Sequence, residues 1–339
     1  MKLSWSRLSL PLARVFRTSR AIRTDKETIW VKITHGAHAG WGESVPMDTY
    51  HQTLESAEGC LRAAQHDLGE NPFDLERTIG GMAEKFPTES ATVAAIDAAL
   101  HDLVGKTLGV PIVRMLGLDP ATLPLTSYSL GIADPEETAE LARSKSSYPI
   151  FKLKLGTEQD EELVARVHES APRAVMRVDA NMAWSVDRAL EMLPVLQRYG
   201  VELLEQPLPA GDLEGLAVLK RRRVLPIVAD ESCVGPGDVL KVASCVDGIN
   251  IKLSKCGGIR QGLKMIHIAR AAGLKVMLGC MIESSLGISA AAQLSPLADW
   301  LDLDGHLLLA RDPFTGLGGE GGRLTPGGGP GLGVRPAFE

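Results

Sequence analysis

The chain has 339 residues, enough for a barrel domain of ordinary size and a smaller accessory domain. Apolar residues make up 45% of it and charged residues 23%, no apolar run reaches the roughly 18 residues that cross a bilayer, and the N-terminus lacks the apolar stretch of an export signal. The net charge of −6 argues against nucleic-acid and membrane partners, so we expect a cytoplasmic protein that acts on a small molecule.

Residues 1–115 are typical of a small α+β domain. Residues 28–33 are rich in apolar and β-branched side chains, and a turn-rich segment joins them to residues 41–44, which predicts an antiparallel hairpin. Residues 93–108 carry apolar side chains at helical spacing, and Gly109 and Pro111 end the predicted helix.

Residues 116–315 show eight short β-rich runs, each ending in polar residues and followed by an amphipathic stretch. Such an alternation is typical of parallel βα units, and eight of them can close into a barrel. One residue per run marks the predicted strand end, and the marks lie 21 to 29 positions apart: Tyr128, Lys154, Asp179, Glu205, Asp230, Lys252, Met281 and Asp302.

Residues 316–339 form a tail whose glycines and prolines cannot sustain a helix, so we expect irregular structure. The string GLGGEG in this tail fits a dinucleotide-binding pattern, but no strand and no helix are predicted around it. A nucleotide site is therefore not expected. Five scattered cysteines without a C-x-x-C pair also argue against disulfides and structural zinc.

Three carboxylates follow successive strands at one period: Asp179, Glu205 and Asp230. Because the carboxyl ends of barrel strands meet at one face, these side chains should converge on one pocket. Three hard oxygen ligands suit one Mg²⁺, or Mn²⁺, better than zinc.

Two lysines are predicted to face each other across that pocket. Lys152 and Lys154 share one side of their strand, and Lys252 follows four strands later, half-way round an eight-stranded barrel. One lysine could remove the α-proton of a metal-bound carboxylate, giving an enediolate, while the other returns a proton to the opposite face. Two opposed bases predict racemisation or epimerisation.

The motifs FKLKLG, VDAN, LLEQPL, ADES, INIKLSKCGG and GCMIESSLG resemble the muconate-lactonizing subgroup of the enolase superfamily. The resemblance implies a modified (β/α) barrel, with a capping domain built from the N-terminal segment and the C-terminal tail. It also implies the roles of the residues in the motifs. Asp179, Glu205 and Asp230 would be the metal ligands, Lys154 and Lys252 the acid/base pair, Lys152, Met281 and Ile282 substrate contacts, and Asn181, Glu231 and Lys255 supporting residues.

The last strand carries Asp302 and Asp304 in a D-x-D pattern that resembles the signature of dipeptide epimerases. Two carboxylates there suit a substrate ammonium, which together with a metal-bound carboxylate requires a dipeptide. The loop containing Arg17, Arg20 and Arg23 should lie at the pocket mouth, and Arg20 best resembles an arginine that receives an acidic side chain. The expected reaction is epimerisation of L-Ala-D/L-Glu, a step in cell-wall peptide metabolism.

Other activities of the same superfamily use the same metal and lysines: racemisation of N-acylamino acids, synthesis of o-succinylbenzoate and cycloisomerisation of muconate. Their substrates have no free ammonium, so the D-x-D pair would lack a partner. A non-catalytic binding barrel is a further alternative, although pure binding needs no second lysine. A homo-oligomer is possible, but no patch in the sequence predicts one.

Overall fold

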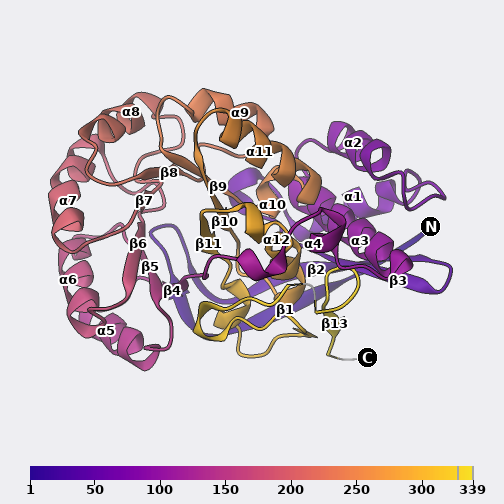
Figure 1. The fold of residues 1–339 in the computed structure, drawn as a ribbon, viewed down its shortest axis with the longest axis horizontal. Helices are drawn as coiled ribbons and strands as arrows, with labels where there is room; N and C mark the ends of the chain where they lie inside the picture. Colours follow the sequence, from indigo (N-terminus) through magenta and orange to yellow (C-terminus); the bar gives the residue numbers. More distant parts are fainter. Residues whose placement is uncertain (327, 338–339) are drawn as a thin grey trace.

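The computed structural model describes residues 1–326 and 328–337 of the chain. In this part of the chain an antiparallel three-stranded sheet with its helices lies against an eight-stranded parallel sheet (Figure 1). The α/β barrel and the separate N-terminal sheet predicted from the sequence are both confirmed.

The N-terminal sheet has the order β1-β2-β3, formed by Lys2–Arg17, Ile22–His35 and His38–Ser44. The predicted strand at residues 28–33 and its hairpin partner are therefore confirmed as parts of β2 and β3. The sequence did not reveal β1, because its charged and apolar residues follow no clean alternation. The loop expected to carry three arginines is also shorter than predicted, since Arg17 ends β1 and Arg23 lies in β2.

Helix α3 (Ser90–Leu108) packs on this sheet and is buried along most of its length. The predicted helix at residues 93–108 is confirmed and begins three residues earlier, and Gly109 ends it at a φ of 71°. A Cβ on Gly42 of β3 would lie 2.0 Å from the carbonyl oxygen of Ala95, so glycine permits the close approach of strand and helix. Three further helices accompany α3: α1 (Leu54–Ala64), α2 (Leu75–Lys85) and α4 (Ile112–Met115).

The barrel strands run parallel in chain order, and Ser127, directly before the first strand, donates a backbone hydrogen bond to the carbonyl oxygen of Leu301 in the last strand. The strands are β4 (Tyr128–Leu130), β5 (Ile150–Lys154), β6 (Val175–Asp179), β7 (Leu204–Glu205), β8 (Ile227–Ala229), β9 (Gly248–Ile251), β10 (Lys275–Gly279) and β11 (Trp300–Asp302). The eight predicted runs are confirmed within the described residues. The mark at Tyr128 is wrong, because this residue begins β4 instead of ending it.

Helices follow the barrel strands and cover the outside of the ring (Figure 1). They are α5 (Pro135–Ser144), α6 (Asp160–Ser170), α7 (Val186–Arg198), α8 (Leu213–Arg222), α9 (Pro236–Val242), α10 (Leu253–Cys256), α11 (Ile259–Ala271) and α12 (Ser285–Ala292). None of the helices in the described part of the chain has the length and the apolar character needed to cross a membrane.

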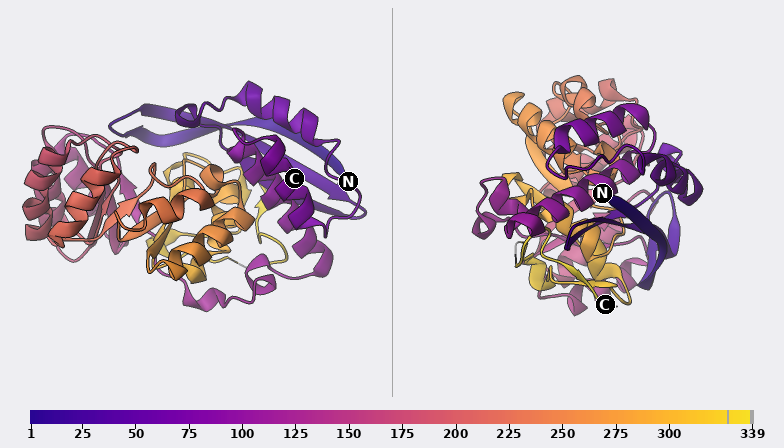
Figure 2. Two further views of the ribbon diagram at one scale, coloured as in Figure 1. Left: turned by 90° about the horizontal axis from the view of Figure 1, so that it is seen from above. Right: turned by 90° about the vertical axis from the view of Figure 1, so that its right-hand side faces the viewer.

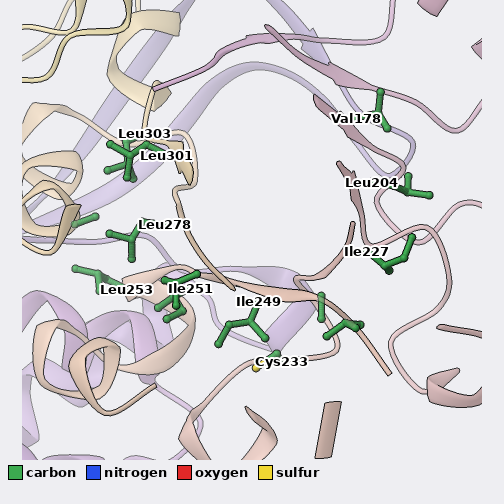
Figure 3. Close-up of a cluster of buried hydrophobic side chains, with 14 of the residues drawn as sticks. Val178, Leu204, Ile227, Cys233, Ile249, Ile251, Leu253, Leu278, Leu301 and Leu303 are labelled. Carbon is green, nitrogen blue, oxygen red and sulfur yellow. The ribbon is translucent and has the colours of Figure 1, made fainter. Parts of the chain in front are cut away.

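Alternation along the barrel strands positions the polar side chains. Val178, Leu204 and Ile249 belong to the large core between strands and helices, and Figure 3 shows them around the ring. Since successive side chains of a strand point to opposite faces, their neighbours Asp179, Glu205 and Asn250 point inward. A separate buried cluster of Leu203, Val228, Met277 and Trp300 fills the inside deeper down. The polar residues therefore gather in the upper part of the barrel.

The C-terminal tail is irregular, as expected: the short strands β12 (Phe314–Thr315) and β13 (Arg335–Pro336) flank a 3₁₀ turn at residues 320–322. Gly331 pairs with Pro111, and Leu332 N donates to the Asp102 carboxylate of α3 at 2.8 Å. These contacts support the division into a capping domain (residues 1–115), a barrel (116–315) and a tail that returns to the capping domain (316–339), which we keep as a proposal.

The β1–β2 hairpin extends from the N-terminal sheet over the barrel (Figure 2). Its turn contacts the barrel at several strand ends: Ile132 N donates to the carbonyl oxygen of Arg17 at 2.8 Å, and Ser19 Oγ lies 3.4 Å from the carbonyl oxygen of Ala180. The hairpin thereby covers the end of the barrel at which the polar side chains gather.

Candidate active site

A cavity of about 330 Å³ lies between the hairpin and the carboxyl ends of the barrel strands. Its lining combines charged side chains of the barrel with residues of the capping domain. Of the residues predicted from the sequence, those that line it are Lys154, Asn181, Asp230, Glu231, Lys252, Met281, Ile282, Asp302, Asp304, Arg20 and Arg23. Most of the predicted site is thus brought to one place.

Asp179, Glu205 and Asp230 form a buried acidic triad at the ends of β6, β7 and β8. Each offers a carboxylate oxygen, and these oxygens lie within 4.8 Å of one another, which suits one metal ion. Burial raises the pKa of Glu205 to about 7, and the charge of Asp179 adds to this increase. Burial also raises the pKa of Asp179, but Lys154 and Lys152 lower it by more, to about 2.

Unpartnered acceptors around the triad fit a cation. Asn181 Oδ1 and Glu231 Oε2 are buried without a hydrogen bond in the described structure, and so is Glu205 Oε2, although Lys152 Nζ lies 2.7 Å from it. Buried polar atoms usually have partners, and Asn181 and Glu231 line the same cavity as Asp230, so their unpartnered oxygens suit a cation there. Hard oxygen donors of this kind match Mg²⁺.

Lys154 and Lys252 reach the cavity from β5 and from the end of β9, four strands apart in the barrel. Lys154 Nζ lies 2.7 Å from Asp179 Oδ2, and Lys252 Nζ lies 2.7 Å from Asp230 Oδ2. Burial lowers the pKa of Lys252, but the carboxylates of Asp230 and Glu205 raise it by more. Their predicted roles as acid and base stay predictions.

Lys152 and Lys255 lie below the cavity and are fully buried. Lys152 Nζ lies 2.5 Å from Asp302 Oδ2 and 3.4 Å from Asp179 Oδ2. Lys255 Nζ lies 2.5 Å from Asp230 Oδ1 and donates to three backbone carbonyls. Both lysines balance the charge of the triad from beneath, which supports the predicted supporting role of Lys255. The predicted contact of Lys152 with a substrate stays a prediction.

The D-x-D carboxylates line the side of the cavity next to β4. Asp302 Oδ1 accepts a hydrogen bond from Ser127 Oγ at 2.8 Å, and its other oxygen faces Lys152. Asp304 accepts hydrogen bonds from the backbone N of Ser129 at 2.5 Å and from its hydroxyl at 3.2 Å. Burial raises the pKa of Asp304 to about 7, and the charge of Asp302 adds to this shift. Asp304 forms no ion pair with any described residue, and its polar contacts are those with Ser129.

Three cations of the hairpin surround the mouth of the cavity: Arg20, Arg23 and Lys26. Arg20 already has partners, because its Nη1 lies 2.7 Å from Glu231 Oε1 and its Nη2 donates to Thr49 Oγ1. Arg23 and Lys26 form no ion pair with any described residue. Lys26 Nζ donates to the carbonyl oxygen of Pro46 at 2.8 Å, and burial together with Arg23 lowers the pKa of Lys26 to about 8.

Sequence reasoning missed several residues of the cavity wall. Lys26, Ser129 and the segment Asp48–Tyr50 line it, but none of them belongs to a motif quoted above. Ser129 could have been found, since it follows Tyr128, the residue that marked this run, and successive side chains of a strand point to opposite faces. The segment Asp48–Tyr50 gave no signal, because its place depends on how the capping domain packs on the barrel.

The chain is similar in sequence to known protein families and to individual epimerases. A family profile described as mandelate racemase / muconate lactonizing enzyme, N-terminal domain, matches residues 7–117, and one described as enolase C-terminal domain-like matches residues 136–339. An L-Ala-D/L-amino acid epimerase of Maribacter sp. is 37% identical over 96% of this chain and 97% of its own length. An L-Ala-D/L-Glu epimerase of Bacteroides thetaiotaomicron is 37% identical over 98% of this chain and 88% of its own.

The fold is also similar to that of a solved dipeptide epimerase. The dipeptide epimerase of Enterococcus faecalis, complexed with Mg and the dipeptide L-Leu-L-Tyr, superposes with a TM-score of 0.94. The two proteins are 32% identical, and the match covers 98% of each chain.

Proposed function

Because the chain belongs to the mandelate racemase / muconate lactonizing enzyme family, with an enolase-like barrel, we propose that it is a magnesium-dependent dipeptide epimerase. The observation that carries the proposal is one cavity lined by Lys154 and Lys252, by Asp302 and Asp304, and by Asp230. Asp230 belongs to the acidic triad, whose other two carboxylates, Asp179 and Glu205, lie buried beside it. The triad suits a metal that takes the carboxylate of a substrate. Asp304 suits the ammonium at the other end of a dipeptide.

The mechanism follows from the places of the side chains. Asp179, Glu205 and Asp230 would hold the Mg²⁺. When bound, Mg²⁺ supplies positive charge that stabilises the negative charge developing on the substrate carboxylate. Asp304 binds the substrate ammonium and fixes the dipeptide along the cavity. The α-carbon of its C-terminal residue then lies between Lys154 and Lys252.

Inversion needs two proton transfers on opposite faces of that carbon. A neutral lysine on one face takes the α-proton, and the protonated lysine on the other face gives a proton to the same carbon. The substrate keeps the same number of protons, and the charges of the two lysines are exchanged. The cover formed by the hairpin limits water at the cavity during these steps.

An acidic side chain on the second residue is favoured by the charge at the mouth. Arg23 and Lys26 line the cavity there and have no carboxylate partner in the described structure, whereas the charge of Arg20 is already matched by Glu231. We propose that the substrate is L-Ala-D/L-Glu or a close analogue. Arg20 stays a candidate for the side-chain carboxylate, with Arg23 and Lys26 beside it.

The proposal is tested by incubating a dipeptide library with the protein and Mg²⁺ and measuring inversion at the C-terminal residue. We expect the highest kcat/KM for L-Ala-L-Glu among L-Ala dipeptides. A preference for apolar or basic second residues would contradict the acidic assignment. Activity on N-acylated amino acids that survives Asp304→Asn would favour the racemase alternative instead.

Proton exchange into D₂O, followed by NMR, tests the two-base mechanism. We expect Lys154→Ala and Lys252→Ala each to reduce inversion by at least about 100-fold, because each removes one acid/base group. Each variant should still exchange the α-proton of one epimer, the one that faces the remaining lysine. Lys241→Ala, an exposed lysine outside the cavity, is the control. Unchanged inversion in Lys154→Ala would exclude this mechanism.

A cytoplasmic location, a place in cell-wall peptide metabolism and a homo-oligomeric state stay predictions. A dipeptide substrate with a free ammonium and an acidic second residue is compatible with peptides released from cell walls. This supports the predicted place in cell-wall peptide metabolism.

A further inference from the structure

Gln206 lies directly after the triad carboxylate Glu205 and is fully buried. Its backbone has a φ of 33°, in the left-handed region that residues other than glycine seldom adopt. Asn181 and Met182, which follow the first carboxylate, also have positive φ angles, of 45° and 67°. Such strained backbone persists where the surroundings hold it firmly.

The backbone of Gln206 joins the ends of the three strands that carry the triad. Its carbonyl oxygen accepts a hydrogen bond from Met182 N at 2.8 Å, three residues after Asp179. Its own N donates to the carbonyl oxygen of Val228 at 2.9 Å, two residues before Asp230.

The side chain of Gln206 extends the same connection to the third carboxylate. Its Oε1 accepts from the backbone N of Asp230 at 2.9 Å and from Ser232 N at 3.1 Å. Its Nε2 donates to the carbonyl oxygen of Leu208 and to Ser232 Oγ, both at 2.8 Å. Both ends of the amide therefore have two partners each, and its orientation is fixed.

We propose that Gln206 is a positioning residue that sets the distances among the three carboxylates and so determines the affinity for Mg²⁺. It touches no carboxylate side chain of the triad and does not line the cavity. It acts through the backbone, because the amide holds the N–H of Asp230 at a fixed place relative to Glu205. The inference rests on the metal ligands of the proposed function.

The test is the dissociation constant of Mg²⁺, measured by calorimetry on the metal-free full chain and on its Gln206→Met variant. Methionine has a similar length but cannot make the four side-chain hydrogen bonds. We expect Mg²⁺ to bind about 10- to 100-fold more weakly, the usual effect of losing a partner outside the ligands themselves. Binding as tight as in the wild type would overturn the inference.

Gln293 offers a matched control. It is also a fully buried glutamine, its Oε1 accepts from Val113 N at 2.9 Å, and its Nε2 lies 3.3 Å from the carbonyl oxygens of Ser289 and Leu332. We expect Gln293→Met to lower the stability and to leave the dissociation constant of Mg²⁺ within about twofold of the wild type. An equal loss of affinity in both variants would show a general effect of destabilisation and would overturn the inference.

A second variant keeps the test decisive if Gln206→Met does not fold. Ser232→Ala removes one partner of Gln206 Nε2 and should weaken Mg²⁺ binding by about threefold, a smaller loss than that of removing the whole amide. An unchanged affinity would then overturn the inference. If the wild-type chain itself bound no Mg²⁺, the metal site of the proposed function would be wrong, and the inference would fail with it. If the wild-type chain bound Mg²⁺ and the variants bound it equally well, only the inference would fail.

Discussion

At the scale of single residues, each group of the cavity is set by its immediate neighbours. Lys152 and Lys154 share one face of β5, but successive positions on one face lie about 6.6 Å apart along a strand. Lys154 therefore reaches the cavity, while Lys152 lies in the charged layer beneath it. Asp302 ends β11 and faces Lys152, whereas Asp304 lies beyond the end of that strand, lines the cavity and accepts hydrogen bonds only from Ser129 among the described residues.

Asp304 predicts a pH dependence of substrate binding. Because its pKa is raised to about 7, the carboxylate takes up a proton below that pH and loses its attraction for the ammonium of a dipeptide. We expect KM for L-Ala-L-Glu to rise as the pH falls below about 7. Steady-state kinetics between about pH 5.5 and 8.5 measure the effect.

The Asp304→Asn variant is the control for this pH dependence. It should show a high KM that no longer changes across the same range, since asparagine does not titrate. A rise in KM that persists in Asp304→Asn would assign the dependence to another group.

At the scale of elements, one carboxylate joins three segments that are distant in sequence. Asp102 of α3 accepts from Trp41 N in β3 at 2.9 Å, from Leu332 N in the tail at 2.8 Å, and from Lys106 Nζ at 2.6 Å. The tail has little regular structure of its own, so these bonds fix its course over the capping domain.

Asp102→Ala should lower the free energy of unfolding by about 2–6 kcal/mol, because it leaves two buried N–H groups without an acceptor, at about 1–3 kcal/mol each. Urea unfolding measures the loss. Asp102→Asn keeps one acceptor oxygen and should lose less, and Asp238→Ala, whose aspartate is much less buried, should lose least. Equal losses in Asp102→Ala and Asp102→Asn would contradict this account.

At the scale of the whole molecule, α3 joins the capping domain to the barrel. Asp97 Oδ2 accepts from Ile259 N at the start of α11 at 2.5 Å, and His101 Nδ1 lies 3.3 Å from Asp97 Oδ1. Burial lowers the pKa of His101, but the charge of Asp97 raises it by more. A protonated imidazole at this place balances the charge of Asp97, the carboxylate that holds the two parts together.

The contact between Asp97 and His101 should make the stability of the protein depend on pH. A histidine whose pKa is raised on folding contributes its full stabilisation below its unfolded pKa of about 6.5 and loses it as the pH rises through the folded value. We expect the difference in unfolding free energy between the wild type and His101→Gln to shrink as the pH rises above about 6.5. A constant difference from pH 6 to pH 9, measured by urea unfolding, would show that His101 is neutral in the folded protein.

The sequence predicted the barrel and its carboxylates well, because parallel strands alternate strictly and end in polar residues. Asp179, Glu205 and Asp230 converge for that reason. It did not predict β1, whose charged residues hide its period, or the segment Asp48–Tyr50, which reaches the cavity only through the packing of two domains. Arg20 was predicted at the mouth, but its ion pair with Glu231 joins residues 211 positions apart, which no local pattern reveals.

The cover of the cavity comes from a hairpin and a short turn of the capping domain, while the acid/base and metal-binding side chains lie at the ends of barrel strands or directly after them. Mutations in the cover can therefore exchange one peptide side-chain preference for another without touching the chemistry beneath. Changes near Arg23 and Lys26 would alter the part of the cavity wall that comes from the capping domain and would leave the barrel side chains in place. The substrate preference can therefore change while the reaction stays the same.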